Sequence, residues 1–279
     1  MKYADLHVHT DFSDGTFTPE EVVALAGSKG LSSIAICDHD CVDAIAPSMK
    51  RAKDIPIEIV PGVELTVIKD RREIHVLGYF ISWQAGWFRK ILKRVQRGRI
   101  ERIDTMIEKL KRFNIKLDRN IVFDLAGNKG SVGRLHMARA LFKTGSVSSI
   151  QAAFDKYIGD LKPCYVEDVG FEMREAVDLI LRAGGVPVLA HPHTIGDDAF
   201  VVELIKYGIR GIEVFHSDHR PTVRKKYEEI AKEYGLLITG GSDCHGLAKK
   251  RVLLGSVKIP YELVEKLKEE AEKIRAGRT

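Results

Sequence analysis

His7 and His9 are the first residues whose types and spacing could do chemistry. They stand two positions apart in a short run that starts apolar, so both imidazoles would face the same side of a β-strand. Asp14 follows in an Asp-Gly turn, where Gly15 allows the tight backbone that returns the carboxylate to the two rings. This set is typical of metal binding, although a histidine pair near an N-terminus is also often a plain surface pair.

Similar side chains follow other short apolar runs along the chain. The run over residues 33–37 leads into His39, and the run over residues 57–60 leads to Glu64. Continuous apolar runs of this length are typical of strands buried on both faces. The same arrangement, on a predicted strand or just beyond one, is found for His75, His191, Asp243 and His245.

The predicted strands alternate with helical patterns. A capping box at residues 18–21 begins one helix, and amphipathic segments follow further strands. Such an alternation, with polar residues after the strands, is typical of a parallel barrel whose functional groups gather at the carboxyl-terminal rim. We therefore expect an α/β fold, a distorted TIM-barrel-like barrel built from residues 1–81 and 167–279.

Residues 82–166 differ from the rest, because they are rich in Lys, Arg, Ile and Leu at helical spacing and lack buried-strand runs. We predict a helical insertion that forms part of the substrate pocket. The basic residues over 89–102 fit either a solvated helix surface or one cationic face. An apolar stripe that should pack inward is formed by Ile103, Met106, Ile107 and Leu110.

Glycines at 130 and 133 open a further helix inside this insertion. They place Arg134 and His136 in its first turns. A helix N-terminus with a neighbouring arginine suits a phosphate, although such residues are also common on plain surfaces.

Composition limits the function classes. The 279 residues carry a formal net charge of +5 with both signs interspersed, which fits a mixed-sign surface with a mild preference for small anions better than a nucleic-acid-binding face. The four cysteines have no CxxC spacing, so we expect no disulfide framework. Neither a signal-like segment nor a membrane span stands out, so we expect a cytoplasmic protein with no membrane association and no evident obligate protein partner.

If the strand ends meet around one cavity, six imidazoles and three carboxylates crowd together there. Groups at such close range repel or compete for protons unless cations organise them. Mixed imidazole and carboxylate ligands suit Mn, Zn or Fe, and nine are too many for one ion. We therefore expect two or three divalent metal ions, with ligands drawn from His7, His9, Asp14, His39, Glu64, His75, His191, Asp243 and His245.

Taken together, these motifs resemble the polymerase and histidinol phosphatase (PHP) family of metal-dependent phosphoesterases. The matching stretches are residues 5–10, 13–15, 38–40, 61–64, 74–75, 190–192 and 242–246. The resemblance implies a distorted seven-stranded β/α barrel with a trinuclear site. It would assign one metal to His7, His9, Glu64 and Asp243, a second to Asp14, His39 and His245, and a third to His75 and His191 with Glu64 bridging.

Within the family, the insertion and the patterns at 133–136 and 213–219 are most similar to the branch that acts on nucleoside 3′,5′-bisphosphates and on the 5′ ends of short RNA. Asp14 points the same way, because the histidinol phosphate branch tends to carry histidine there. Cys41 and Cys244 depart from the family pattern, in which Thr-like and aromatic residues are usual, but neither removes a ligand.

The implied reaction is hydrolysis of a phosphate monoester of a nucleotide, with a metal-bridging hydroxide as the nucleophile. To neutralise phosphate oxygens or protonate the leaving group, we expect Arg134, His193, His216 and His219. For substrate binding we expect Ser13, Arg134, His136, His193 and His219. Asp38 and Asp40 are expected to orient His39. The alternatives are a histidinol phosphate phosphatase and a non-catalytic, structural PHP module, while an amidohydrolase fits the motifs less well.

Overall fold

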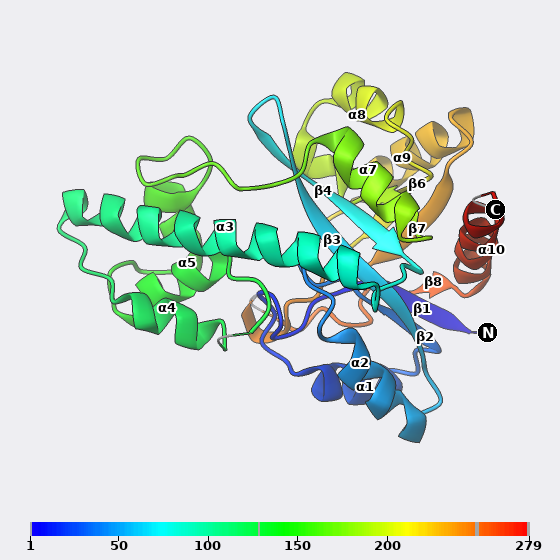
Figure 1. Ribbon diagram of the computed structural model, residues 1–279, viewed down its shortest axis with the longest axis horizontal. Helices are drawn as coiled ribbons and strands as arrows, with labels where there is room; N and C mark the ends of the chain where they lie inside the picture. The colour runs from blue at the N-terminus through cyan, green and yellow to red at the C-terminus, as the bar shows by residue number, and fades with distance from the viewer. Residues whose placement is uncertain (1, 128, 249–250, 278–279) are drawn as a thin grey trace.

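The structure, a computed structural model, describes residues 2–127, 129–248 and 251–277. Within these ranges the chain forms an eight-stranded sheet that curls into a barrel with helices on its outside, and a helical lobe projects from one side (Figure 1). This agrees with the predicted TIM-barrel-like α/β class. The strands are β1 (Tyr3–Val8), β2 (Ser33–Ile36), β3 (Glu58–Lys69), β4 (Arg72–Tyr79), β5 (Val186–Leu189), β6 (Gly211–His216), β7 (Leu237–Gly241) and β8 (Ile259–Pro260).

The barrel is mixed rather than fully parallel, which corrects one expectation. Strands β1 to β3 are parallel to one another, and so are β5 to β7, but β4 is antiparallel to both β3 and β5. Asp70 and Arg71 join β3 to β4 in a two-residue turn with φ of 50° and 62°, so no helix separates these strands. Because β4 runs in the opposite direction, its start lies at the rim where parallel strands end, and this brings His75 opposite Thr66 of β3.

The barrel closes between β1 and the segment that follows β7. Val8 and Cys244 form an isolated parallel bridge, and the His9 N–H donates to the Cys244 carbonyl oxygen at 3.0 Å. The buried Asp5 carboxylate accepts the backbone N–H groups of Ser242 and Gly255 at 2.8 and 2.9 Å. The last strand, β8, has only two residues and pairs antiparallel with the start of β1.

Gly241 is the closest approach at this seam, so we expect Gly241→Ala to destabilise the barrel. A Cβ at this position would lie 2.3 Å from both Cβ and N of His7. Relieving that overlap moves the β1 backbone, at an expected cost of about 1–3 kcal/mol in the free energy of unfolding, measured by urea denaturation. Gly86→Ala is the matched control, because its Cβ would meet nothing within 4 Å. Equal stability of the two variants would contradict the close approach.

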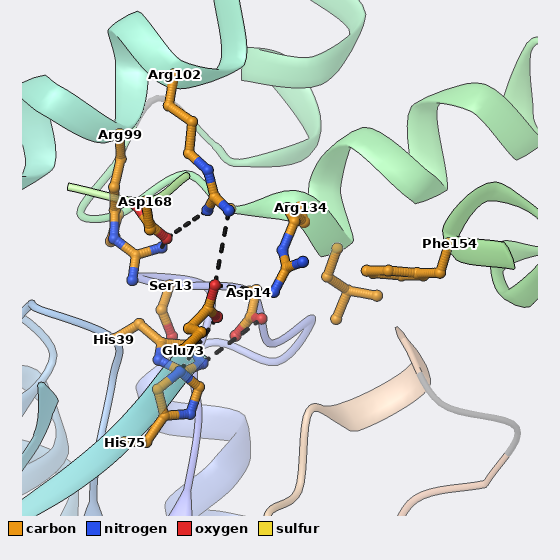
Figure 2. Close-up of a pocket in the computed structure, with 13 residues that line it drawn as sticks. Ser13, Asp14, His39, Glu73, His75, Arg99, Arg102, Arg134, Phe154 and Asp168 are labelled. Carbon is orange, nitrogen blue, oxygen red and sulfur yellow. Dashed lines mark hydrogen bonds and ion pairs between the residues drawn. The ribbon is translucent and has the colours of Figure 1, made fainter. Parts of the chain in front are cut away.

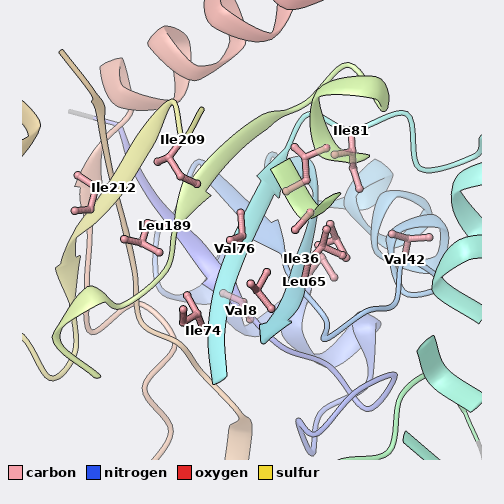
Figure 3. Packing of buried hydrophobic residues seen from close by; sticks show 14 of the residues in the cluster. Val8, Ile36, Val42, Leu65, Ile74, Val76, Ile81, Leu189, Ile209 and Ile212 are labelled. Atoms are coloured by element: carbon pink, nitrogen blue, oxygen red, sulfur yellow. The ribbon is translucent and has the colours of Figure 1, made fainter. Parts of the chain in front are cut away.

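One hydrophobic cluster joins the sheet to the helices around it (Figure 3). Val8, Leu65, Val76 and Leu189, from four strands, are fully buried in it. Apolar side chains on both faces of these short strands explain the continuous apolar runs in the sequence. The surrounding helices are α1 (Pro19–Ser28), α2 (Ile45–Arg51), α7 (Met173–Arg182), α8 (Asp198–Ile205), α9 (Pro221–Glu233) and α10 (Glu262–Ala276).

The helical lobe has a second cluster, which includes the predicted apolar stripe. Its elements are α3 (Gly86–Leu110), α4 (Arg119–Leu125), α5 (Arg134–Lys143), α6 (Ile150–Ala153) and a π-helical segment (Phe154–Ile158). Helix α3 contributes to both clusters: Phe88 and Leu92 pack in the barrel cluster and Met106 in that of the lobe. The division at residues 82 and 166 therefore stays a prediction.

Among the described residues, no helix is both long enough and apolar enough to cross a membrane.

Candidate metal centre and adjoining pocket

Glu64 lies at the centre of the predicted ligand set. Its Oε2 is 3.2–3.3 Å from the nearest nitrogens of three imidazoles, and its Oε1 is 3.0 Å from one nitrogen in each of two more. One carboxylate therefore contacts five rings. These are His7, His9 and His39 on the Oε2 side, and His75 and His191 on the Oε1 side.

The other two predicted carboxylates complete the cluster. Asp243 Oδ1 lies 3.2 Å from His9 Nε2, and Asp14 Oδ1 lies 3.2 Å from His245 Nε2. Asp14 Oδ2 is 3.9 Å from His39 Nε2. All nine predicted ligands thus lie in one cluster, but their grouping differs in part from the implied one, because His9 lies with Asp14, His39 and His245, and His39 also lies with Glu64 and His75.

Two of these residues have an unusual backbone. His191 has φ of 24° and Asp243 has φ of 50°, both in the positive range that non-glycine residues seldom adopt. Each follows a barrel strand directly or within two residues, so the left-handed turn returns its side chain to the rim. Backbone strain of this kind concentrates at functional sites.

Two glutamates support the imidazoles from behind. Glu213 Oε1 lies 3.1 Å from His7 Nδ1, and its Oε2 accepts the backbone N–H of His191 at 2.8 Å. Glu73 Oε1 lies 3.4 Å from His75 Nε2. Carboxylates that hold the far nitrogen of a ligating histidine fix its orientation. Glu73 was not predicted, and Glu213 was predicted only as part of the 213–219 pattern, although a charge inside a buried strand such as β6 is a usable signal.

The expected role of Asp38 and Asp40 is wrong. Asp38 accepts hydrogen bonds from the N–H and hydroxyl of Thr10, at 2.8 and 2.7 Å. Asp40 accepts from the Thr66 N–H at 3.1 Å and pairs with the Arg99 guanidinium at 2.7 Å. These carboxylates therefore fix the loops around His39 rather than its ring.

The donor set fits divalent cations. Six buried side-chain atoms of the predicted ligands have no hydrogen-bond partner among the described residues, although buried polar atoms are normally satisfied. Three of the nitrogens lie 3.2–3.3 Å from Glu64 Oε2, and Asp14 Oδ1 lies 3.2 Å from His245 Nε2, so these five atoms present lone pairs to a shared space. The five are Nε2 of His7, Nε2 of His9, Nδ1 of His39, Oδ1 of Asp14 and Oε2 of Glu64, and the sixth atom, Nε2 of His75, faces Glu73 instead.

The charge balance agrees with this reading. Burial opposes ionisation of Glu64, yet the imidazoles of His39, His75 and His7 hold the pKa of its carboxyl well below its usual range. Burial lowers the pKa of His39 to about 3 against the pull of Glu64 and Asp14. Burial likewise opposes the charged form of His75, but Glu64 and Glu73 raise its pKa to about 10. The Glu64 carboxylate is therefore held in the ionised form that binds a cation, whereas a metal ion bound through His75 would have to displace its proton.

A second histidine group flanks this cluster. His193 Nδ1 lies 2.8 Å from His219 Nε2, and His219 Nδ1 lies 2.7 Å from the Val214 carbonyl oxygen. His216 Nε2 lies 3.6 Å from Asp243 Oδ2. His193 and His216 line a cavity of about 240 Å³ together with ligand residues, whereas His219 lies behind His193.

A second cavity, of about 230 Å³, adjoins the ligands on the side of the helical lobe (Figure 2). Arg99 and Arg102 of α3 reach it and are only 5% and 4% exposed, so the solvated-surface interpretation is wrong for both. Arg99 pairs with Asp40, and Arg102 with Asp168. The cavity lining also includes Ser13, Asp14, His39, Glu73, His75 and Arg134.

The three residues predicted to contact substrate here lie differently. Arg134 lines the cavity and pairs with Glu73 at 2.9 Å and with Asp160 at 2.5 Å. Ser13 also lines it, and its hydroxyl donates to Asp38. His136 is fully buried, and its Nδ1 accepts the N–H of Gly133 at 3.1 Å, so its ring caps α5.

Comparisons with known proteins agree with this geometry. The PHP domain matches residues 5–167. The chain is 31% identical to the 3′,5′-nucleoside bisphosphate phosphatase of Chromobacterium violaceum over 250 residues, which cover 88% of each chain. It is also 31% identical to the 5′-3′ exoribonuclease Rnm of Escherichia coli (strain K12), over 86% of this chain and 84% of that protein.

A solved structure from Bifidobacterium adolescentis, described as a metal-dependent phosphoesterase, superposes with a TM-score of 0.87 at 28% identity and covers 95% of this chain and 94% of that one. The match to the domain, the two relatives and this fold agree with one another. The chain therefore belongs to the PHP family of metal-dependent phosphoesterases.

Proposed function

We propose that the protein hydrolyses phosphate monoesters of nucleotides that carry a second phosphate, such as nucleoside 3′,5′-bisphosphates. One observation supports this most directly: three arginines line the same cavity as the ligand residues Asp14, His39 and His75. Arginine side chains bind phosphate oxygens through paired hydrogen bonds. The cavity therefore has room for a reacting phosphate beside the ligands and for a second phosphate beside the arginines, namely Arg99, Arg102 and Arg134.

In this proposal, the nine predicted ligands hold two or three divalent ions of Mn, Zn or Fe. When bound, they supply a water of lowered pKa and stabilise the attacking and departing oxygens. The side chains of the protein hold the phosphate ester in the orientation that in-line attack requires. Arg134 is the cation best placed to bind the substrate phosphate. One of its two partners, Asp160, is 67% exposed, so this ion pair contributes little stability and a phosphate can replace Asp160.

The flanking histidines handle protons. The Val214 carbonyl oxygen must receive a hydrogen, so His219 carries its proton on Nδ1 and accepts at Nε2 from His193. His193 then presents an unprotonated Nε2, so in this state it accepts a proton rather than supplying one to the leaving group. His216 accepts the Asp218 N–H at Nδ1, which leaves its proton on Nε2, facing Asp243. His216 is therefore the better candidate for the proton donor.

Short RNA is a second substrate class supported by the shape of the site. The cavity lined by His193 and the cavity lined by Arg134 share His39 and His75. A chain longer than one nucleotide can therefore continue from one cavity into the other across the ligands. The relative from Escherichia coli is named as a 5′-3′ exoribonuclease.

The test compares adenosine 3′,5′-bisphosphate, adenosine 5′-monophosphate and histidinol phosphate in steady-state assays of the metal-loaded protein. We expect the bisphosphate to have the highest kcat/KM. Arg134→Met should lower kcat/KM for the bisphosphate roughly 10- to 100-fold, because a charge-assisted hydrogen bond contributes about 1.5–3 kcal/mol. The kcat/KM for the monophosphate should fall less, because this substrate lacks the second phosphate.

Arg112→Met is the matched control, because Arg112 is exposed on the same lobe and lines neither cavity. It should leave both rates unchanged. Preference for histidinol phosphate would replace the proposal with the phosphatase of that branch. If Arg134→Met lowers kcat/KM equally for both nucleotides, Arg134 does not bind the second phosphate.

A further inference from the structure

The arginine-lined cavity has one apolar wall, made by Leu135 and Phe154. Its other side chains are charged or polar. Both wall residues are only partly buried and line the cavity, and Phe154 also packs against the hydrophobic cluster of the lobe. A phosphate alone makes no use of an apolar surface. The wall is therefore available to a different, less polar part of the ligand.

The backbone around Phe154 is built to a special geometry. Phe154 begins the π-helical segment, and its carbonyl oxygen accepts the N–H of Gly159 at 2.9 Å. A Cβ on Gly159 would lie 2.5 Å from that same oxygen, so the wide turn needs glycine there. Single π-helical turns inside helices are rare and occur frequently at functional sites. Here the turn interrupts the helix begun by α6 at the residue that reaches the cavity.

The apolar wall lies next to the phosphate-binding cation. Leu135 follows Arg134 directly at the start of α5. In Figure 2 the Phe154 ring extends from the lobe toward Arg134, on the side away from Arg99. A group bonded to a phosphate at Arg134 can therefore reach the Phe154 ring without leaving the cavity.

We propose that Phe154 and Leu135 form a subsite for the nucleobase of the substrate, with the base lying against the Phe154 ring. This rests on the proposed nucleotide substrate and names the part of it that the lobe recognises. Every base has a π-face, and stacking on an aromatic ring tolerates any base. Because the wall offers no hydrogen-bonding group, the subsite selects nucleotides over other phosphate esters but discriminates little among bases.

The test pairs adenosine 3′,5′-bisphosphate with its abasic analogue, 1-deoxyribose 3,5-bisphosphate, on the metal-loaded enzyme. Phe154→Ala should raise KM for the adenosine compound roughly 10- to 100-fold, from the loss of one stacked base, and leave kcat/KM for the abasic compound unchanged. Phe154→Trp should keep the nucleotide KM. Phe154→Leu preserves apolar packing without a π-face and should behave like the alanine variant.

Phe142→Ala is the matched control, because Phe142 is a half-exposed aromatic residue of the same lobe that lines neither cavity. This variant should leave KM and kcat/KM unchanged for both substrates. A loss shared equally by both substrates in the Phe154 variants would assign Phe154 a purely structural role and overturn the subsite, as would an unchanged nucleotide KM. If the native enzyme cleaves neither bisphosphate but does cleave histidinol phosphate, the proposed function fails, and that result is read without any Phe154 variant.

Discussion

Glu64→Gln is expected to abolish phosphoesterase activity and to lower the bound metal. The carboxylate contacts five imidazoles, so a neutral amide withdraws the one charge that all the ligand groups share. Residues that merely support a ligand cost roughly 10- to 100-fold when changed, and the loss here should exceed that range. The measurement is kcat/KM together with metal content by elemental mass spectrometry after dialysis.

The control for this variant is Glu108→Gln, an exposed carboxylate on α3 that pairs with the neighbouring Lys111. It should retain native activity and metal content. His9→Ala should reproduce the loss seen in Glu64→Gln, because the His9 ring contacts both Glu64 and Asp243. Native turnover in Glu64→Gln would refute the assignment of this cluster as the metal centre.

Arg99→Met is expected to destabilise the fold by about 3–5 kcal/mol, the usual cost of removing one partner from a buried ion pair. Arg99 pairs with Asp40 at 2.7 Å and lies 3.6 Å from Asp168, and all three side chains are buried. Methionine fills similar volume but leaves both carboxylates without that cation. The free energy of unfolding from urea denaturation gives the value.

Arg97→Met provides the comparison, because Arg97 is exposed two residues away on the same helix. It should change the unfolding free energy by less than about 0.5 kcal/mol. The double variant Arg99→Met with Asp40→Asn separates the pair from its surroundings. If the double variant is no more stable than Arg99→Met alone, the cost does not come from the unpaired Asp40 charge.

The ligand positions could be predicted from the sequence, because parallel strands fix which residues meet. His39 and His191 lie just beyond parallel strands and so share one rim, whereas Glu64, expected beyond a strand, lies inside β3, which continues to Lys69. The histidine spacing at 7 and 9 needed only the two-residue period of a strand. Strand ends are a local property, so no knowledge of distant contacts was required.

The reversed strand could not be predicted in this way. A two-residue hairpin turn needs positive φ at both positions, which usually calls for Asn or Gly. Asp70 and Arg71 occupy those positions here, so the local signal for a hairpin was weak. Tertiary pairing of β4 with both neighbours decides its direction instead.

The buried arginines of the pocket could be recognised from the sequence. Arg99 and Arg102 lie in register with Leu92, Val95 and Met106 on the buried stripe of α3. Charged residues at inward positions of an amphipathic helix mark either buried ion pairs or a site. Glu73 gave no comparable signal, because it stands near the exposed start of β4 and its arginine partners come from the lobe.

Helix α3 spans 25 residues, about 37 Å, and its two halves are buried in different hydrophobic clusters. Transplanting the lobe onto a foreign barrel therefore requires the graft to begin at Gly86 rather than in mid-helix. A graft starting near Ile100 leaves out Arg99 and the first half of α3, which packs against the barrel. The transferred lobe would then have no contacts that fix its orientation on the new barrel.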